Sequence, residues 1–375
     1  MRLAIVNLTG GGMSGGYRKY LKEVLPRLVA SSAVTRVDML SPADTVPPEL
    51  SRPATTHGEW ARGDRWRGFR EARRLLLALR PDIVYLPTAR WISSNGLPTV
   101  VMVQNMEPLI NPGYANPWFE RAVNVARRKA TKRACTNATR IIAISAFVRD
   151  FLTTSWEISP ERVGTVYHGV VSAGARAVPV RPGVLGREEA NGGPFLFVAG
   201  SVRPMRGIED GVLALARLKN SLPGLRLVVA GALEGRVGQW SAGLRALVSE
   251  HGLDSRVVWA GKLSEGEMTW CYENCAAFLM TSRVEACPNI ALEAMNSGSV
   301  TISTRNPPMP EFFVDSALYY DAGNPDQLAL QIERVLAMPA RERSGLAESG
   351  RERAHWFNWE ECARRTVEEL GAAAR

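Results

Sequence analysis

The chain has 375 residues, of which 46% are hydrophobic and 22% are charged, and its formal net charge is +9. This length allows two domains with complete hydrophobic cores, and the composition is that of an ordinary globular protein. The sequence contains no run of about 18 apolar residues, which argues against a membrane-spanning helix. It enters an apolar strand directly, so we expect no signal peptide.

Cysteine content and charge narrow the possible partners. The five cysteines are odd in number and show no C-x-x-C pairs, which indicates reduced thiols and argues against a zinc site. The positive charge is compatible with nucleic acid, acidic lipid or phosphorylated substrates. Nucleic acid ranks last, because we find no RNA-binding aromatic motif, zinc finger or helix-turn-helix signature.

The first half of the chain alternates between apolar strands and amphipathic helices. A strand at Leu3 to Asn7 precedes a glycine-rich loop, a helix from about Gly16 to Ala30 and a strand at Val37 to Leu40. Residues 42–68 are treated as loop because they are rich in proline, threonine and charge. The remaining elements expected in this half are helices at 69–79, 117–133 and 147–154 and strands at 83–86, 100–103, 141–145 and 163–167.

The glycine-rich loop allows a second functional interpretation. Gly10, Gly12 and Gly15 match the pattern G-x-G-x-x-G, and Asp38 ends the next strand, where a ribose-binding acid would lie. The same glycines also suit a tight strand-to-helix turn. A dinucleotide site is therefore the rival to the interpretation given below.

The helix expected at Pro117 to Arg133 is strongly basic. Two aromatic residues, Trp118 and Phe119, lie near its start. The helix is either a solvated surface element or a contact with an anionic membrane leaflet, which attracts clustered Lys and Arg with flanking aromatics. The basic residues are Arg121, Arg127, Arg128, Lys129, Lys132 and Arg133.

Residues 171–193 change the character of the chain. They are rich in Pro, Gly, Ala and Arg and lack periodicity, so we place an interdomain linker there. Strand–helix alternation then resumes, which predicts a second doubly wound parallel sheet. Ser264 and Glu267 predict a capping box for a helix that ends near Cys275. The expected strands lie at 195–199, 225–230, 256–260, 276–280 and 299–303, and residues 325–374 are expected to be helical throughout.

Two glutamates, Glu285 and Glu293, follow the strand at 276–280 with seven residues between them. Pro288 suits the first position of a helix, and Gly298 suits its C-terminal cap. Glu285 is therefore expected on the loop after the strand, and Glu293 about one turn into the helix. Both can face the crevice where open α/β sheets bind ligands, beside helix N–H groups that favour a phosphate.

The segment EACPNIALEAMNSG resembles the E-x7-E motif of the retaining glycosyltransferases of family 4, and the resemblance covers nearly the whole chain. It implies an α/β GT-B fold, in which two Rossmann-like doubly wound domains face a central cleft. The domains would be an acceptor domain at 1–170, a linker at 171–193, a donor domain at 194–356 and a helix at 357–375 that crosses back to the first domain. Supporting segments are the glycine-rich loop, AISAFVRDFL at 143–152, GSVRPMRG at 200–207, Glu311 in MPEFF and FNWEECARR at 357–365.

The resemblance also implies roles for individual residues. Glu293 would bind the ribose of a nucleotide diphosphate sugar, and Glu285 would lie near the hydroxyls of the transferred sugar. Arg203 and Arg206 would hold the diphosphate, with Arg206 in place of the family's usual Lys. Glu285, Arg203 and Arg206 are thus the expected catalytic residues. Further donor-side residues would be Gly12, Gly200, Ser201, Lys262, Leu263, Pro288, Asn289 and Ile290. On the acceptor or sugar side we expect Gln104, Asn105 and His168, although a structural hydrogen bond is the preferred interpretation of His168.

The chemistry of the expected reaction fits these residue types. Breaking a glycosyl–phosphate bond requires stabilisation of the negative charge on the leaving diphosphate. Two arginines and the N–H groups of Asn289 and Ile290 can provide it, and no D-x-D motif suits a metal ion. We therefore expect no metal and no cofactor apart from the donor substrate.

The expected function is that of a metal-independent hexosyltransferase in cell-surface polysaccharide biosynthesis. It would move a sugar from a UDP- or GDP-sugar to a glycan or lipid-linked acceptor with retention. We expect it in the cytoplasm, with peripheral contact to the inner face of the plasma membrane through 117–133. Two alternatives stay open. One is a non-catalytic nucleotide-sugar-binding scaffold, because Ser201 stands where the family commonly has an arginine and Gln104 about where many members have a histidine. The other is an NAD-dependent oxidoreductase that uses the Gly10–Gly15 loop.

Overall fold

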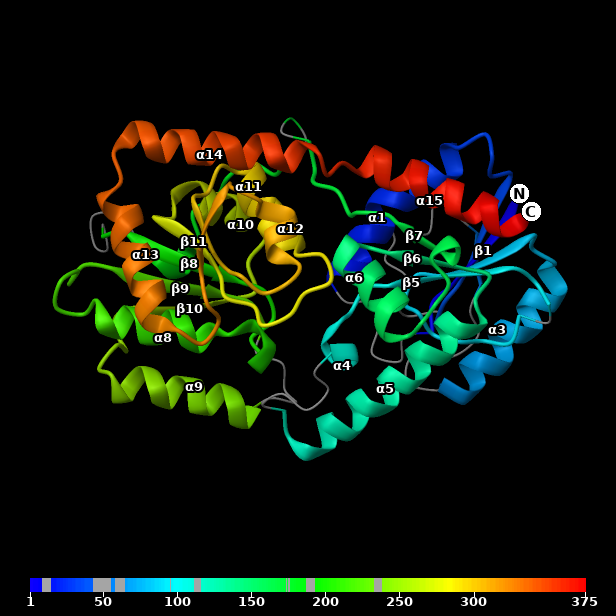
Figure 1. The fold of residues 1–375 in the computed structure, drawn as a ribbon, viewed down its shortest axis with the longest axis horizontal. Coiled ribbons are helices and arrows are strands. Elements are labelled where there is room, and N and C mark those ends of the chain that lie inside the picture. Colours follow the sequence, from blue (N-terminus) through cyan, green and yellow to red (C-terminus); the bar gives the residue numbers. More distant parts are fainter. Residues whose placement is uncertain are drawn as a thin grey trace. The chain divides into compact units, whose positions relative to one another are not determined.

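The chain forms two compact units, each built around one parallel sheet (Figure 1). The first unit comprises Met1–Pro112, Ala122–Gly169 and Asn358–Arg375, and the second comprises Gly113–Arg121 and Val170–Phe357. The residues expected as a linker, 171–193, thus belong to the second unit. The computed structural model describes residues 1–8, 15–42, 55–57, 65–94, 96–110, 116–172, 174, 176–186, 193–232 and 238–375.

In the described part of the first unit, the strand order is β3-β2-β1-β4-β5-β6-β7. Crossovers between parallel strands are right-handed, so α1 lies on one face of this sheet and α3 and α5 lie on the other (Figure 1). The strands are β1 (Arg2–Val6), β2 (Arg36–Leu40), β3 (Thr55–His57), β4 (Ile83–Leu86), β5 (Thr99–Val103), β6 (Arg140–Ala143) and β7 (Val163–Thr165). The helices are α1 (Gly15–Ala30), α3 (Arg65–Leu79), α4 (Glu107–Ile110), α5 (Trp118–Asn137), α6 (Ala146–Asp150) and α15 (Trp359–Ala374). The first four residues of α5 are assigned to the second unit.

The prediction that residues 42–68 are all loop is wrong in two places. β3 lies within them and pairs in parallel with β2, and α3 begins at Arg65 instead of Phe69. β3 is three residues long and reads Thr-Thr-His, so it offers no apolar alternation for a periodicity argument to detect. The first turn of α3 was not predicted either, because its arginines interrupt the apolar pattern.

Asp38 does not lie at the end of its strand. It is the third residue of β2, is buried, and accepts a hydrogen bond from Arg36 at 2.8 Å. A ribose-binding acid belongs at the carboxyl edge of the sheet, so the dinucleotide interpretation is contradicted at this residue. Of the three glycines of the dinucleotide motif, Gly10 and Gly12 lie outside the described residues, and Gly15 is the first residue of α1.

Helix α15 packs on α1 and on the sheet of the first unit. Glu360 accepts a hydrogen bond from Arg27 of α1 at 2.7 Å, and Glu369 accepts one from Arg140 of β6 at 2.7 Å. The Asn358 side chain caps the helix by accepting from the backbone N–H of Glu361. The C-terminal helix α15 therefore belongs to the first unit and packs against its first helix.

In the described part of the second unit, the strand order is β10-β9-β8-β11-β12-β13. The order reverses between β8 and β11, which is the place where open α/β sheets bind ligands. The strands are β8 (Phe195–Ala199), β9 (Arg226–Ala230), β10 (Val257–Gly261), β11 (Ala277–Met280), β12 (Thr301–Thr304) and β13 (Ala317–Tyr320). The helices are α8 (Ile208–Arg217), α9 (Gly238–Glu250), α10 (Glu265–Asn274), α11 (Asn289–Asn296), α12 (Met309–Phe313), α13 (Pro325–Ala337) and α14 (Ala340–His355).

Five of the six described strands of this unit were predicted within two residues at each end. The capping box of α10 is confirmed, because Ser264 Oγ accepts from Glu267 N and Glu267 Oε2 accepts from Ser264 N. β13 was not predicted. The expectation of an unbroken helix over 325–374 is wrong, because the chain leaves helical geometry between α13 and α14 and again between α14 and α15.

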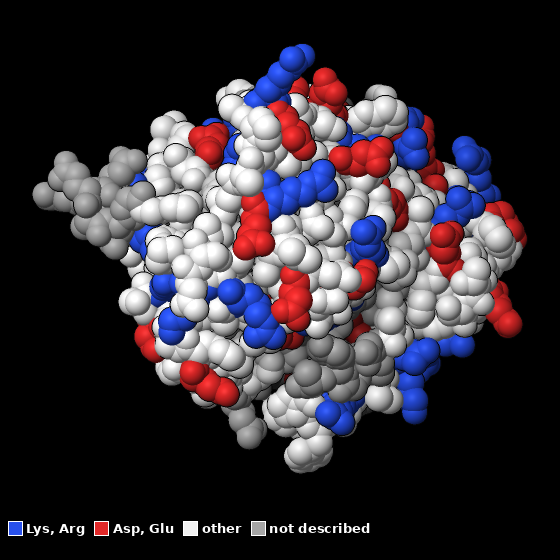
Figure 2. Space-filling view, turned by 60° about the vertical axis from the view of Figure 1, so that its left-hand side comes forward, with Lys and Arg blue, Asp and Glu red and all other residues white. Residues whose placement is uncertain are grey.

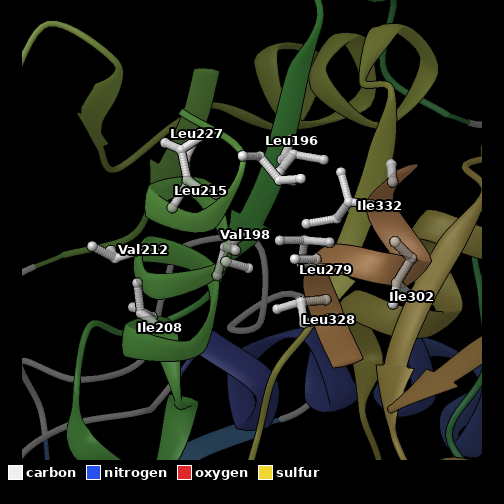
Figure 3. Packing of buried hydrophobic residues seen from close by; sticks show 14 of the residues in the cluster. Leu196, Val198, Ile208, Val212, Leu215, Leu227, Leu279, Ile302, Leu328 and Ile332 are labelled. Carbon is white, nitrogen blue, oxygen red and sulfur yellow. The ribbon is translucent and has the colours of Figure 1, made fainter. Parts of the chain in front are cut away.

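The core of the second unit lies between its sheet and helices α8, α9 and α13. Strands β8 and β11 are buried on both faces, which explains their continuous apolar runs. Figure 3 shows Leu279 of β11 among side chains of neighbouring strands and helices. Labelled members of this cluster are Leu196, Val198, Ile208, Val212, Leu215, Leu227, Ile302, Leu328 and Ile332.

We expect Leu279→Ala to lower the unfolding free energy of the second unit by about 2–5 kcal/mol, because it leaves a cavity in this core. Leu330→Ala, on the exposed side of α13, is the matched control and should change stability by about 0.5 kcal/mol or less. Urea unfolding of both variants, followed by circular dichroism, measures the difference. Equal effects would contradict the assignment of the core.

Candidate functional site

Two loops of the second unit are joined where its strand order reverses. The loop after β8 ends in a 3-10 turn at Pro204–Arg206, and the loop after β11 begins at Thr281. Thr281 Oγ1 donates to Arg206 O at 2.7 Å, and Arg283 N donates to Met205 O at 2.8 Å. Gly207 has φ +62°, and a Cβ there would lie 2.3 Å from Thr281 O, so this close approach requires glycine.

An ion pair joins the predicted catalytic residues Arg206 and Glu285. Arg206 Nη1 donates to Glu285 Oε1 at 2.6 Å and to Ser282 Oγ at 3.0 Å, and Ser282 Oγ donates to Glu285 Oε1 at 2.9 Å. The two charged side chains are only 11% and 17% exposed. The sequence analysis did not identify Ser282 as a site residue, because a serine that follows a strand carries no distinguishing signal.

The ion pair uses one side of the Arg206 guanidinium. The Nε atom is buried and has no hydrogen-bond partner within the described residues. A Cβ at Gly200, where φ is +107°, would lie 2.8 Å from Cζ and Nη2 and 3.0 Å from Nε. The guanidinium therefore packs directly against Gly200, and this close approach requires glycine. A guanidinium is a group suited to gripping a phosphate or carboxylate with two hydrogen bonds.

Glu293 is the fifth residue of α11, as predicted, and its Oε2 accepts a hydrogen bond from the Tyr272 hydroxyl at 3.1 Å. Pro288 precedes the helix as its cap residue instead of being its first residue. Gly298 follows the helix with φ +76°, as expected for a C-terminal cap. Tyr272 lies on α10, and its contact with Glu293 was not predicted.

The start of α11 differs from expectation at one amide. The N–H of Asn289, expected to face a phosphate, donates to Cys287 O at 2.9 Å. The helix start therefore offers fewer amides to an anion than the sequence predicted.

A second charged cluster anchors the loop after β11. Arg283 donates to both oxygens of Asp210, at 2.6 and 2.7 Å, and to Glu209 Oε1 at 3.0 Å. Asp210 also accepts from the Tyr320 hydroxyl and from Gly323 N. Burial raises the pKa of Glu209, although the Arg283 charge acts in the opposite direction. The sequence did not reveal this cluster, because acids in the first turn of a helix are common.

The remaining donor-side residues lie along the same edge of the sheet. Arg203 begins the turn after β8, and its carbonyl accepts from Arg206 N at 3.0 Å. Ser201 follows Gly200 in this loop. Lys262 and Leu263 follow β10, which lies two strands from β8 in the sheet. Gly12 lies outside the described residues.

The predicted acceptor-side residues belong to the first unit. Gln104 Nε2 donates to Pro87 O at 2.7 Å and ties the loop after β5 to the loop after β4. Asn105 Oδ1 accepts from the backbone N–H of Glu107 at 3.1 Å.

His168 is buried, with its ring 5.2 Å from that of Tyr20 and 5.6 Å from that of Trp359. It is a core residue under α15, and the covering residue Trp359 comes from the other end of the chain.

Among the described residues, neither metal ligands nor thiols form a further reactive site. No group of three or more His, Cys, Asp or Glu side chains there could hold a metal ion. The five cysteines are free and buried, and burial raises the pKa of Cys271 and Cys275 to about 12. None of the described helices combines the length and apolar character needed to cross a membrane.

We expect Arg283→Leu to destabilise the second unit by about 3–5 kcal/mol, because it leaves the Asp210 carboxylate buried without its cation. Arg305→Leu is the matched control, since Arg305 pairs with Asp321 at 3.6 Å on the surface. Such an exposed pair contributes about 0–1 kcal/mol. Denaturant unfolding compares the two variants, and similar losses would show that the buried pair is not an anchor.

Two family models cover most of the chain. One described as "Glycosyltransferase Family 4" matches residues 14–173, and one described as "Glycosyl transferases group 1" matches residues 186–353. A D-inositol 3-phosphate glycosyltransferase of Segniliparus rotundus is 24% identical over 63% of this chain and 53% of its own length. A lipopolysaccharide 1,2-N-acetylglucosaminetransferase of Salmonella typhimurium is 27% identical over 47% of each chain.

Solved structures resemble the chain over its full length. Anabaena HepE, in complex with UDP and glucose, has a TM-score of 0.78 at 14% identity and covers 99% of this chain and 100% of its own. At this identity the similarity establishes the fold alone.

The chain spans about half the length of the curated relatives that it matches.

Proposed function

Since the chain belongs to glycosyltransferase family 4 and has the GT-B fold, we propose that it transfers a hexosyl group from a nucleotide diphosphate sugar to an acceptor. The observation that carries the proposal is the Arg206–Glu285 pair at the strand reversal of the second unit. It places a cation and a carboxylate in the loops where this class of sheet binds its ligands. A scaffold that only binds nucleotide sugars would share this site but would not release nucleotide.

The diphosphate would be held by Arg206, Arg203 and the start of α11. Arg206 is already fixed by Glu285 and Ser282, so it needs little reorganisation when charge develops on the leaving group. Its guanidinium is a group suited to gripping phosphate oxygens with two hydrogen bonds. These groups supply positive charge without a metal ion, and we propose a metal-independent reaction.

Retention would follow from attack on the face that the diphosphate leaves. Glu285 accepts hydrogen bonds from Arg206 and Ser282, which makes its carboxylate a poor nucleophile. We therefore favour front-face displacement over a covalent intermediate on Glu285. The bond from C1 to the phosphate oxygen breaks, the bond from C1 to the acceptor oxygen forms on the same face, and the acceptor proton passes to the departing phosphate.

The donor would be a UDP- or GDP-sugar, and the acceptor a glycan or lipid-linked precursor in cell-surface polysaccharide biosynthesis. Support comes from HepE, whose solved complex contains UDP and glucose, and from the lipopolysaccharide transferase among the relatives. Glu293 would accept hydrogen bonds from the ribose, and Glu285 from the transferred sugar. An NAD-dependent reaction is disfavoured by the buried Asp38.

We expect Arg206→Leu to lower kcat for nucleotide release by about 100- to 1,000-fold, because it removes a donor to the leaving diphosphate. The assay measures nucleotide released from a panel of UDP- and GDP-sugars. Arg217→Leu, which breaks an exposed pair with Asp326, is the control and should retain wild-type turnover. Unchanged release by Arg206→Leu with every donor that the wild type uses would refute the site.

We also propose that the protein is cytoplasmic and contacts an anionic membrane surface through α5. Trp118 is 81% exposed at the start of this helix, and Phe119 is also exposed. α3 lies on the same face of the sheet and adds a second group of arginines. On the face shown in Figure 2, basic and acidic side chains are interspersed. Along α3 and α5 the balance is strongly basic, because each helix contains a single acidic residue.

Reversing three charges on α5 tests this contact. We expect Arg127→Glu/Arg128→Glu/Lys132→Glu to weaken binding to phosphatidylglycerol vesicles by at least about hundredfold, since each basic residue contributes about 1 kcal/mol. Vesicle flotation at low and high salt measures the bound fraction.

The matched control changes net charge equally at exposed sites of the second unit. It carries Arg217→Glu/Arg305→Glu/Arg334→Glu and should bind like the wild type. Equal loss by both triple variants, or equal wild-type binding to neutral phosphatidylcholine vesicles, would exclude a specific α5 contact.

A further inference from the structure

Tyr272 is a buried phenol beside the proposed site, and the reaction described above gives it no role. Its ring packs edge-on against Phe197 of β8 at 5.3 Å and against Phe278 of β11 at 5.4 Å. These are the two strands between which the order of the sheet reverses. The position of the ring is therefore fixed by the same framework that positions the loops of the site.

The backbone of Tyr272 is fixed as well. Its carbonyl oxygen accepts a hydrogen bond from Ser299 Oγ at 2.6 Å, and Ser299 directly follows the glycine cap of α11. The residue thus links the end of α10 to the helix that carries Glu293. A side chain held at both its ring and its backbone can place its hydroxyl accurately.

That hydroxyl donates to Glu293 Oε2 at 3.1 Å. Burial, together with the charge of Glu293, raises the pKa of Tyr272 well above its usual value of 10. The phenol therefore stays protonated at physiological pH and acts as a donor to the carboxylate. This bond restricts Glu293, because the terminal torsion of a glutamate side chain is otherwise broad.

We infer that Tyr272 is a positioning residue, which orients the Glu293 carboxylate so that it can accept hydrogen bonds from the vicinal hydroxyls of the donor ribose. Tyr272 acts through Glu293 and does not itself touch the donor. The inference rests on the proposed function and deepens it, because it adds the residue that orients the carboxylate already proposed to bind the 2′- and 3′-hydroxyls of the ribose. A 2′-deoxyribonucleotide would offer the oriented carboxylate one hydroxyl fewer.

The test is Tyr272→Phe, which removes the hydroxyl and keeps the ring between Phe197 and Phe278. Titration calorimetry with UDP, GDP and their 2′-deoxy forms measures the affinities. We expect the wild type to prefer the ribonucleotide, and the variant to bind it about tenfold more weakly, as is typical for a hydrogen bond to a charged group. Binding of the 2′-deoxy form should change much less, so the preference should shrink. With a sugar donor, KM should rise and kcat should change by less than about threefold.

Tyr320→Phe is the matched control. It removes another buried phenol–carboxylate hydrogen bond of the second unit, 3.0 Å long, from Asp210, which keeps its bonds to Arg283 and Gly323. We expect this variant to lose thermal stability but to retain the wild-type preference for ribose over 2′-deoxyribose. A double variant, Tyr272→Phe/Glu293→Gln, should bind UDP no more weakly than Glu293→Gln alone.

The possible results separate the two proposals. If the wild type binds no nucleotide, the proposed function fails. If the wild type prefers the ribonucleotide and Tyr272→Phe keeps both that preference and its affinity, the inference about Tyr272 fails and the proposed function stands. Equal weakening of UDP and 2′-deoxy-UDP binding would show a purely structural role and would also overturn the inference.

Discussion

The ion pair between Arg206 and Glu285 is the interaction on which the rest of the site depends. Both side chains are largely buried, and a buried charge is costly unless it is paired and hydrogen-bonded. Here the pair and Ser282 satisfy one side of the guanidinium and one oxygen of the carboxylate. Each charge therefore holds the other in place. An arrangement that is fixed before the ligand arrives reduces the reorganisation needed during reaction.

This pair can form only because the sheet brings two distant segments together. β8 and β11 are neighbours at the strand reversal, although α8, α9 and α10 separate them along the chain. Glycine at position 207 allows the backbone of one loop to approach Thr281 of the other. The buried bidentate pair of Arg283 and Asp210 then fastens the second loop to the start of α8. Topology, glycine placement and a buried ion pair thus act on the same few residues.

The sequence predicted the parts of this arrangement that are local. Apolar runs gave most strands, and the spacing of Glu285 and Glu293 around Pro288 placed one acid on a loop and the other on a helix, as the structure has them. Periodicity could not find β3, whose three residues are polar.

Contacts between distant segments were not predicted for a different reason. The partners of Glu293 and Arg283 lie on α10 and α8, and the ring that covers His168 lies on α15. A strand-end histidine or a helix-start aspartate looks the same in sequence whether it faces a ligand or a buried partner. Only the packing of elements decides between the two, as it also did for Asp38 inside β2.

The two acids of the motif are held according to one principle. Glu285 receives its hydrogen bonds from Arg206 and Ser282 at Oε1, and Glu293 receives that of Tyr272 at Oε2. In each case a hydrogen bond from the protein holds one carboxylate oxygen, which restricts rotation of the whole group. A carboxylate oriented in this way loses less conformational freedom when sugar hydroxyls bind, so more of the interaction energy appears as affinity. The donors that orient these acids are therefore as much a part of the proposed sugar-nucleotide site as the acids themselves.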